Sequence, residues 1–323
     1  MAKEYIYAVS RIHAKEQSLL TMQDLNGLIM CPDYESCVNM LKDKGYGGEN
    51  DGNNSELMLR SESEKTAELL NELLGDEKDA LDIFKYKADF HNLKLAIKSA
   101  ITLSEPDEYI MRGGKTEPQS IIKSVAEKKF ELLPDYLRDV CEKAFSTLLE
   151  TGRGQLCDII IDKAYLEFIY KQGSFSDSKA ISLYAKLTVL GGNVKTAVRC
   201  ADFGKGLDFI KNALADTPVI DIKELSKAAL DGIDAVCACI SNTEFFELAD
   251  ALRVSVNEFE KQCDNTLMKE LRLQKNDHFS VAPLAAYYLA KESEMKSVRL
   301  ILSAKLNNLD ENVIKERLRD LYV

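Results

Sequence analysis

The stretch Asp89–Ile101, DFHNLKLAIKSAI, indicates the fold class, because its apolar residues follow helical spacing and it has two relatives further along the chain. Phe90, Leu93 and Ile97 recur at steps of three and four, which places them on one face of an α-helix. The relatives are LGGNVKTAVRCADF at 190–203 and EMKSVRLILSAKL at 294–306. A helix that returns in this way predicts an all-α protein with an internal repeat.

The repeat has a period of about one hundred residues. Asn92, Asn193 and Ser297 align with one another, and they stand 101 (193 − 92) and 104 (297 − 193) positions apart. A second pair of segments agrees, because IDKAYLEFIYKQ at 161–172 matches CDNTLMKELRLQ at 263–274 with an offset of 102 (263 − 161). The common offset predicts three helical units, at 1–110, 111–215 and 216–323.

Composition excludes several classes of partner. The net charge is −11, and Lys and Arg are interspersed with Asp and Glu rather than gathered into a basic patch. Such a chain is not expected to bind nucleic acid or bare anionic lipid, since both require concentrated positive charge. Glycine and proline are scarce, with 16 and 6 residues, which favours long helices over many short strands.

No segment has the roughly 18 consecutive apolar residues of a membrane span. The best candidate, FSVAPLAAYYLA at 279–290, is too short and contains Pro283. The N-terminal residues MAKEYIYAVSRIHAKE carry charges where a signal peptide needs an apolar core. The protein is therefore expected in the cytoplasm, and any membrane association should run through another protein.

Several residues are typical of the starts and ends of helices. Thr21, Ser61 and Ser241 each precede an acidic residue by three positions, which predicts helix starts, and the Thr217-Pro218 pair is a further candidate start. Gly173 stands where a left-handed helix end is expected.

Three stretches are expected to be breaks between helices: 45–55, 103–120 and 214–222. The first of them, GYGGENDGNNS, offers almost nothing to bury, so it is expected to be mobile and dispensable for stability.

No catalytic or cofactor motif emerges from the sequence. Gly191-Gly192, 152–154 and 204–206 lack the spacing of phosphate-binding loops and are interpreted as helix ends. The eight cysteines are scattered, and Cys237 and Cys239 lack the partners of a zinc or redox site, so buried reduced thiols are expected. No cofactor or metal is predicted.

Histidines and paired carboxylates also favour structural roles. His13, His91 and His278 each stand alone, without a second histidine at metal-ligand spacing or a nucleophile motif nearby. Asp158 and Asp162 share one helix face, but a solvated surface is the favoured interpretation because no matching acidic pair is evident.

Four stretches carry a resemblance to a known family. They are YIYAVSRIHAKEQSLLTMQDLNGLIMCPDYESCVNMLKDKGYGG at 5–48, YKADFHNLKLAIKSAI at 86–101, IDKAYLEFIYKQ at 161–172 and PLAAYYLAKESEMKSVRLILSAKLNNLDENVIKERLRDLYV at 283–323. In this order they resemble the C-subunit family of V-type ATP synthases (V-type ATPases), whose eukaryotic counterpart is the d subunit. The resemblance runs from Tyr5 to Val323.

The resemblance implies a funnel-shaped body of three helical units around a pseudo-threefold axis. It also implies a non-catalytic rotor subunit on the cytoplasmic face of the membrane, which joins the central stalk to the ring of proteolipid subunits and transmits torque for proton or sodium ion transport. On this basis Lys94, Lys195 and Arg299 either face a partner or lie on a solvated helix edge. Asn92 and Asn193 are candidates for capping or bridging helices.

One departure separates the three repeats, and two other functions stay open. Asp89 and Glu294 occupy equivalent positions, but the middle repeat has Leu190 there, so an acidic role cannot be common to all three.

A helical scaffold that binds partner helices in a soluble complex is the first alternative, although most such proteins repeat every 20 to 45 residues. A helical enzyme with a site assembled from distant residues is the second.

Overall fold

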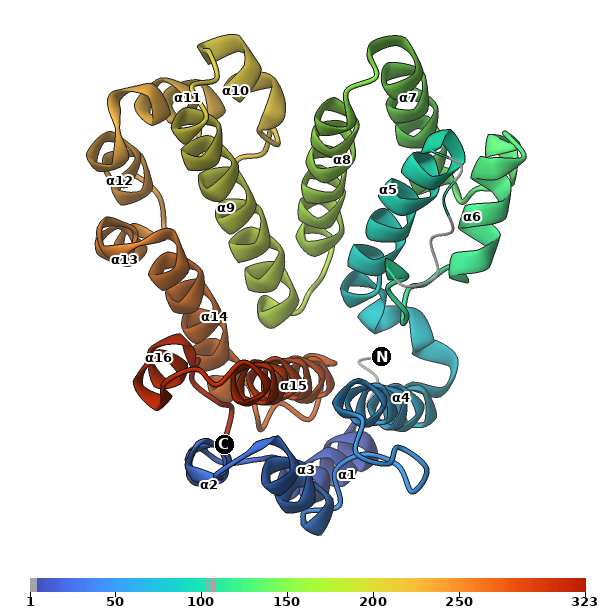
Figure 1. Ribbon diagram of the computed structural model, residues 1–323, viewed down its shortest axis with the longest axis vertical. Coiled ribbons are helices and arrows are strands. Elements are labelled where there is room, and N and C mark those ends of the chain that lie inside the picture. Colours follow the sequence, from blue (N-terminus) through green and yellow to red (C-terminus); the bar gives the residue numbers. More distant parts are fainter. Residues whose placement is uncertain (1–4, 103, 105–108) are drawn as a thin grey trace. The chain divides into compact units, whose positions relative to one another are not determined.

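A computed structural model describes residues 5–102, 104 and 109–323, and over those residues its helices are joined by turns and loops, with no strand (Figure 1). The all-α prediction is therefore confirmed. The chain folds into two compact units, each built from segments that are far apart in the sequence. Unit 1 comprises Met1–Ala80, Ser178–Ile181 and Glu260–Val323, and unit 2 comprises Leu81–Asp177 and Ser182–Phe259.

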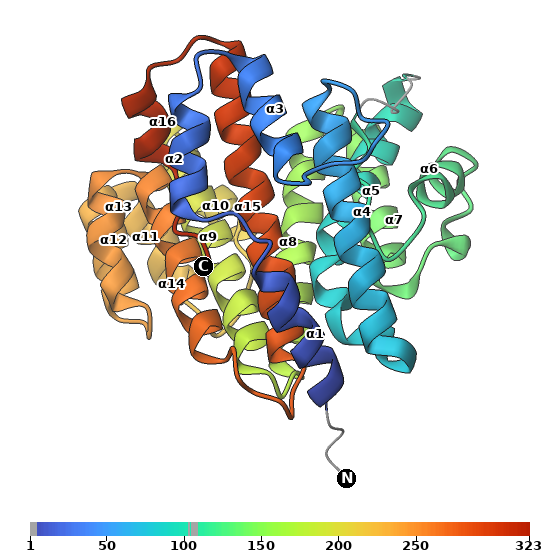
Figure 2. The ribbon, with the colours of Figure 1, turned by 90° about the horizontal axis from the view of Figure 1, so that it is seen from below.

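Unit 1 is organised around one long helix, α15. Its helices are α1 (Ile6–Glu16), α2 (Met22–Met30), α3 (Tyr34–Asp43), α4 (Ser55–Leu74), most of α14 (Val256–Leu273), α15 (Ala282–Leu306) and α16 (Glu311–Arg317). α15 packs against α1, α2, α3, α4 and α16, which come from both ends of the chain (Figures 1 and 2). Figure 2 shows α1 and α2 beside α15.

The core of unit 1 forms around α15, most of whose residues are buried. Apolar side chains of α15, including Val298 and Ile301, are inaccessible to solvent and lie in one cluster with Leu25 of α2, Val38 of α3 and Met58 of α4. Burial of each such side chain stabilises the fold by about 1.5–3 kcal/mol. The N-terminal and C-terminal parts of the chain thus share a single core.

Unit 2 contains the remaining helices. They are α5 (Tyr86–Thr102), α6 (Pro118–Ala126), η3 (Phe130–Leu132), α7 (Asp135–Thr151), α8 (Gly154–Ser174), most of α9 (Lys179–Asp202), α10 (Leu207–Ala213), α11 (Ile222–Asp231), α12 (Ile233–Ser241), η4 (Phe246–Leu248) and α13 (Ala249–Val254). The 3-10 segment η1 (Gly75–Phe84) connects α4 to α5. α5 packs against α6, α7 and α8, and α11, α12 and α13 pack in succession.

The predicted apolar face of α5 lies in the core of unit 2. Phe90, Leu93 and Ile97 are buried, as the spacing predicts. Phe90 belongs to an aromatic cluster with Tyr136 of α7 and Phe168 of α8, whose rings stack at a centroid distance of 5.3 Å. Such ring contacts add about 0.5–1.5 kcal/mol per pair beyond area burial, so they fix α5, α7 and α8 to one another.

Only some of the predicted helix starts are correct. Thr21 forms a full capping box with Asp24 and opens α2. Ser61 instead lies inside α4, which Asn54 caps, and Ser241 is the last residue of α12. Pro218 precedes α11 by several residues, because Asp221 provides the cap there. A hydroxyl residue three positions before an acidic residue therefore predicted a helix start correctly at Thr21 and wrongly at Ser61 and Ser241.

The glycine predictions divide in the same way. Gly152 and Gly204 adopt left-handed conformations directly after α7 and shortly after α9, as expected of helix ends. Gly191 and Gly192 instead lie within α9, where a Cβ on Gly192 would come within 2.7 Å of the Leu166 side chain of α8. Close packing of α8 on α9 explains this glycine. Gly173 continues α8 rather than ending it.

The segment 45–55 is a loop, but the expectation that it buries nothing is wrong. Tyr46 is 6% exposed, and the backbone N–H of Gly47 donates to the Glu62 carboxylate over 3.0 Å. The Lys65 ammonium donates to the carbonyl oxygen of Gly47 over 2.5 Å. The first part of the loop is thus anchored on α4.

Element bounds repeat with the period seen in the sequence. The first residues of α8 and α14 differ by 102 positions (256 − 154), and those of α9 and α15 differ by 103 (282 − 179). The division into three units at 1–110, 111–215 and 216–323 stays a prediction, as does their arrangement around an axis. Part of the predicted break at 103–120, namely 103 and 105–108, lies outside the described residues.

Candidate functional site

Polar side chains at repeated positions join three helices to segments that lead into other helices: α5 to the segment before α6, α9 to the segment between α10 and α11, and α15 to the segment before α2. Asn92 on α5 donates through Nδ2 to the Met111 carbonyl oxygen over 2.7 Å, and its Oδ1 accepts the Met111 N–H over 2.9 Å. Asn193 on α9 makes the same pair of bonds with Ala215, over 2.9 and 2.8 Å. Both asparagines are inaccessible to solvent. Met111 and Ala215 lie outside the helices, so each asparagine joins a helix to a non-helical segment rather than capping a helix or bridging two. We call each such arrangement a helix junction.

The acidic residues at the first and third repeats act on equivalent segments. Asp89 accepts the backbone N–H of Thr116, two residues before α6, and Glu294 accepts the N–H of Leu20, two residues before α2. A Cβ on Gly114 would overlap Asp89 Oδ1, so glycine is required for the chain to approach this carboxylate. The Leu190 side chain cannot accept a hydrogen bond. In the middle repeat, Glu167 of α8 instead accepts the Asp216 N–H over 3.0 Å, next to the Asn193 pair.

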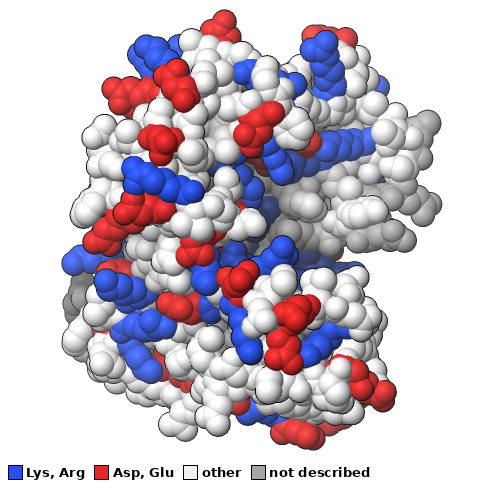
Figure 3. Space-filling model, turned by 60° about the vertical axis from the view of Figure 1, so that its left-hand side comes forward, with Lys and Arg blue, Asp and Glu red and all other residues white. Residues whose placement is uncertain are grey.

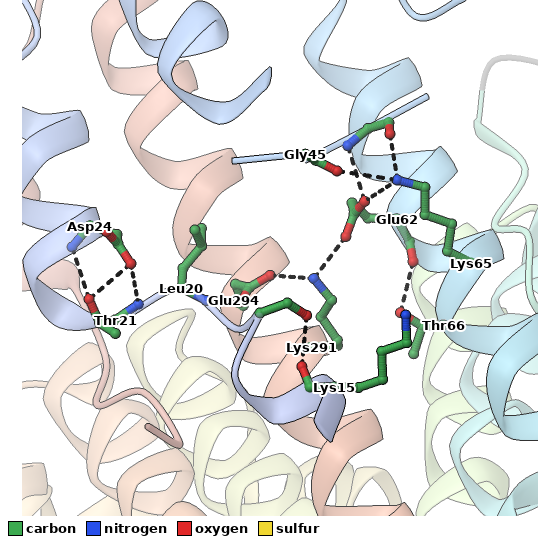
Figure 4. Close-up of polar contacts among 12 residues, drawn as sticks. Lys15, Leu20, Thr21, Asp24, Gly45, Glu62, Lys65, Thr66, Lys291 and Glu294 are labelled. Carbon is green, nitrogen blue, oxygen red and sulfur yellow. Dashed lines mark hydrogen bonds and ion pairs between the residues drawn. The ribbon is translucent and has the colours of Figure 1, made fainter. Parts of the chain in front are cut away.

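The third junction carries a buried cluster of charges, drawn in Figure 4. The Lys291 ammonium on α15 donates to Glu62 of α4 over 2.8 Å and to Glu294 over 2.7 Å. Glu62 also accepts Lys65 over 2.9 Å, and Glu294 accepts the Leu20 N–H over 2.6 Å. Two ammonium groups thus balance two carboxylates. The cluster ties α15 and α4 to the segment before α2.

Protonation in this cluster follows from its burial and its partners. Burial alone would lower the pKa of Lys291, but Glu294 and Glu62 raise it above 10.5. Burial would raise the pKa of Glu62, yet Lys291 and Lys65 hold it below 4.5. For Glu294 burial prevails over Lys291 and the Leu20 N–H, so its pKa lies above 4.5. The arrangement holds charge in place, which is a structural task.

No catalytic constellation accompanies these junctions in the part of the chain that the structure describes. No group of three or more His, Cys, Asp or Glu side chains there could hold a metal ion. The eight cysteines are free thiols, six of them buried. His13 and His278 come together with ring centroids 6.1 Å apart, which the sequence did not indicate, and His13 contacts a backbone carbonyl.

The predicted partner-facing cations lie on three different helices. Lys94 of α5 pairs with Asp162 over 2.7 Å, and Arg299 of α15 pairs with Glu56 over 3.0 Å. Lys195 is exposed on α9. Whether any of them faces a partner stays a prediction. Asp158, interpreted as a solvated residue together with Asp162, is in fact paired with Lys98 over 2.8 Å.

The surface mixes charges of both signs. Lys and Arg side chains lie among Asp and Glu side chains, with uncharged areas between them, on the face drawn in Figure 3. Among the helices described, none is both long enough and apolar enough to span a bilayer.

The sequence of the chain matches a known protein family. Residues 8–317 match the family described as ATP synthase (C/AC39) subunit. The chain belongs to this family. The match includes all three repeats of the long helix, and it confirms the resemblance seen in the sequence. The protein is accordingly a non-catalytic component of an ATPase complex.

Several C subunits of A-type and V-type ATPases are similar to the chain over nearly its whole length. The C subunit of the A-type ATP synthase of Methanocaldococcus jannaschii is 25% identical over 98% of this chain and 86% of the relative. The C subunit of the V-type sodium ATPase of Enterococcus hirae is 23% identical, with coverage of 96% and 97%. The C subunit of the V-type ATP synthase of Thermus thermophilus is 22% identical, with 94% of each chain covered.

The junction residues include some that sequence reasoning missed. Lys291 and Glu62 stand in ordinary helical patterns, and neither carries a motif. The available signal was the alignment of Glu294 with Asp89, which marks a position where an acid recurs in an apolar helix. A buried acid requires a partner, so Lys291, one helical turn before Glu294, was the residue to examine.

Proposed function

We propose that the protein joins the central stalk of a V-type or A-type rotary ATPase to the proteolipid ring in the membrane. The match to the ATP synthase (C/AC39) family over residues 8–317 carries this proposal. In this role the chain lies on the cytoplasmic face of the membrane and is held there by the other subunits. It transmits torque between the stalk and the ring.

The helix junctions suit a part that must transmit torque without bending. Hydrogen bonds between buried side chains and buried backbone are costly to break, because the separated groups would have no water to bind. Asn92, Asn193 and Glu294 each fasten a helix in this way to a segment that leads into another helix. We propose that the three helical units at 1–110, 111–215 and 216–323 surround a pseudo-threefold axis in a funnel.

The decisive assay measures ATP hydrolysis and ion transport side by side on membranes that carry the complex. Removal of this chain should leave hydrolysis by the soluble catalytic head possible and abolish ion transport. Addition of the purified chain should restore transport, whereas an equal amount of an unrelated helical protein should not. Transport that persists without the chain, or that does not return on its addition, would contradict the proposal.

Salt provides a second readout of the same attachment. The chain is acidic, with a net charge of −11, and exposed contacts between opposite charges weaken as ions screen them. Release of the chain from membranes should therefore increase with ionic strength. Release that is independent of salt would rule out an electrostatic contribution to the attachment.

A further inference from the structure

An exposed apolar face lies on unit 2 where α11, α12 and α13 meet. Phe246 and Val254, at the start of η4 and the end of α13, are 58% and 76% exposed. They are eight residues apart, with Asp250 midway, so helical spacing places all three on one side of the η4 and α13 segment. Large apolar side chains with this exposure are typical of protein interaction sites when polar residues surround them.

The neighbouring helix pair extends the same face. Leu230 lies near the end of α11 and Ile233 begins α12, and both are exposed on either side of Gly232. Arg253 pairs with Asp234 over 3.5 Å, which brings the end of α13 to the start of α12. Leu230, Ile233, Phe246 and Val254 together form what we call the α11–α13 face. These helices lie on the left in Figure 1, and Figure 3 turns that side toward the viewer.

The charge around the α11–α13 face is predominantly negative. Six acidic and two basic residues lie within four positions of its apolar side chains. They are Asp231, Asp234, Glu244, Glu247, Asp250 and Glu258, and Lys227 and Arg253. Arg253 pairs with Asp234 and Asp250, and Lys186 pairs with Glu244 and so adds a third cation to the face. Acidic residues still outnumber basic ones by six to three, so the face has a negative net charge.

We propose that this face binds a Lys- and Arg-rich amphipathic helix of another subunit in the ATPase complex. Apolar side chains of that helix would cover Ile233, Phe246 and Val254, and its basic residues would face the surrounding carboxylates. Charge decides between the possible occupants. An anionic lipid surface would be repelled, and a second copy of the chain would place acidic residues against acidic residues.

The inference rests on the proposed function in one respect: the chain must lie between other subunits of an ATPase complex. The first test replaces Phe246 with the photo-crosslinker p-benzoylphenylalanine in the intact membrane complex, with the same replacement at exposed Phe203 as the control position. Mass spectrometry should identify a crosslinked peptide of net positive charge from another subunit. Crosslinking no stronger than at Phe203, or crosslinking to lipid, to a second copy or to an acidic peptide, would overturn the inference.

The second test measures rebinding to membranes stripped of the chain. Val254→Asp should reduce the retained amount about tenfold or more, because a carboxylate would be buried against apolar partner residues. Leu149→Asp, at a similarly exposed site on α7, should bind like the wild type. Both variants should keep the wild-type circular dichroism, since both side chains are exposed.

The outcomes separate this inference from the proposed function. Equal retention of Val254→Asp and wild type, with transport restored by both, would refute the docking face alone. Failure of the wild-type chain to restore transport would instead refute the proposed function, whatever the crosslinking shows. Reversal of charge with Asp234→Lys should weaken retention most at low salt, where screening is least; retention unaffected by this variant would contradict the proposed charge match.

Discussion

Replacement of Lys291 with methionine should destabilise unit 1 far more than the same replacement at Lys65. Both ammonium groups bind the Glu62 carboxylate at nearly the same distance, 2.8 and 2.9 Å. Their surroundings differ, because the Lys291 side chain is 6% exposed and that of Lys65 is 50% exposed. Methionine preserves most of the length and apolar contact of lysine, so the comparison isolates the charge.

The expected magnitude follows from what each variant leaves behind. Without Lys291, Glu62 and Glu294 are buried carboxylates that have lost their shared cation, and loss of one partner of a buried ion pair costs about 3–5 kcal/mol. Loss of an exposed pair costs up to about 1 kcal/mol. For a unit of this size, Lys291→Met should lower the melting temperature by roughly 6–20 °C and Lys65→Met by no more than about 4 °C.

Differential scanning calorimetry of the full-length chain provides the assay. In Lys291→Met, Glu62 keeps its pair with Lys65, whereas Glu294 loses the cation that neutralised it. Addition of Glu294→Gln to Lys291→Met removes that carboxylate, so it should return part of the lost stability. Equal effects of the two lysine variants would refute the reasoning, since burial would then not determine the contribution of the pair. A double variant less stable than Lys291→Met would refute it as well.

Three further predictions concern the junctions and the loop. Asn193→Ala leaves the backbone N–H and carbonyl of Ala215 unpaired, so it should cost about 2–4 kcal/mol in urea unfolding, against little change for Asn242→Ala at an exposed helix end. Tyr46→Ala should cost about 3–5 kcal/mol in the same assay, because the ring is buried beside the Lys291 ammonium; a cost below about 1 kcal/mol would restore the view of a dispensable loop. The stability difference between wild type and Lys291→Met should be full from neutral pH to pH 10.5, decline as pH rises through the raised pKa of Lys291, and shrink in acid as Glu294 and then Glu62 take up protons; a difference that instead grows above pH 10.5 would contradict the assigned charge.

Local signals predicted those features that depend on neighbouring residues. The face of Phe90, Leu93 and Ile97 and the capping box of Thr21 follow from spacing within one helix, and both are confirmed. The predicted helix start at Ser61 is wrong because the position of this motif within a longer helix was not visible from the motif itself. Its hydroxyl and acid have the right spacing, but Asn54 begins α4 two turns earlier, and a helix already under way has no free N–H groups there to cap.

Tertiary contacts account for the rest of what the sequence did not reveal. The Gly191-Gly192 pair predicted a helix end, yet Gly192 lies inside α9. A glycine is needed there because Leu166 of α8 occupies the space that a side chain at position 192 would fill. Lys291 resembles any lysine on a long helix, and only the approach of Glu62, 229 residues away in the chain, makes it a buried charge. The asparagine junctions were partly foreseeable, since Asn92 and Asn193 recur at the repeat offset.

The construction of unit 1 from both ends of the chain governs how the protein is made. Residues 1–80 leave the ribosome first, but α15, around which they pack, is completed only near the end of synthesis. At about 5–20 residues per second, the 226 residues (306 − 80) from the end of this segment to the end of α15 impose a wait of roughly eleven to forty-five seconds. During that interval the apolar faces of α2 and α3 have no core to enter, so the nascent N-terminal segment is a natural client for a chaperone. The last residue of unit 2 is 259, so unit 2 can fold while the ribosome is still synthesising α15, the helix that unit 1 requires.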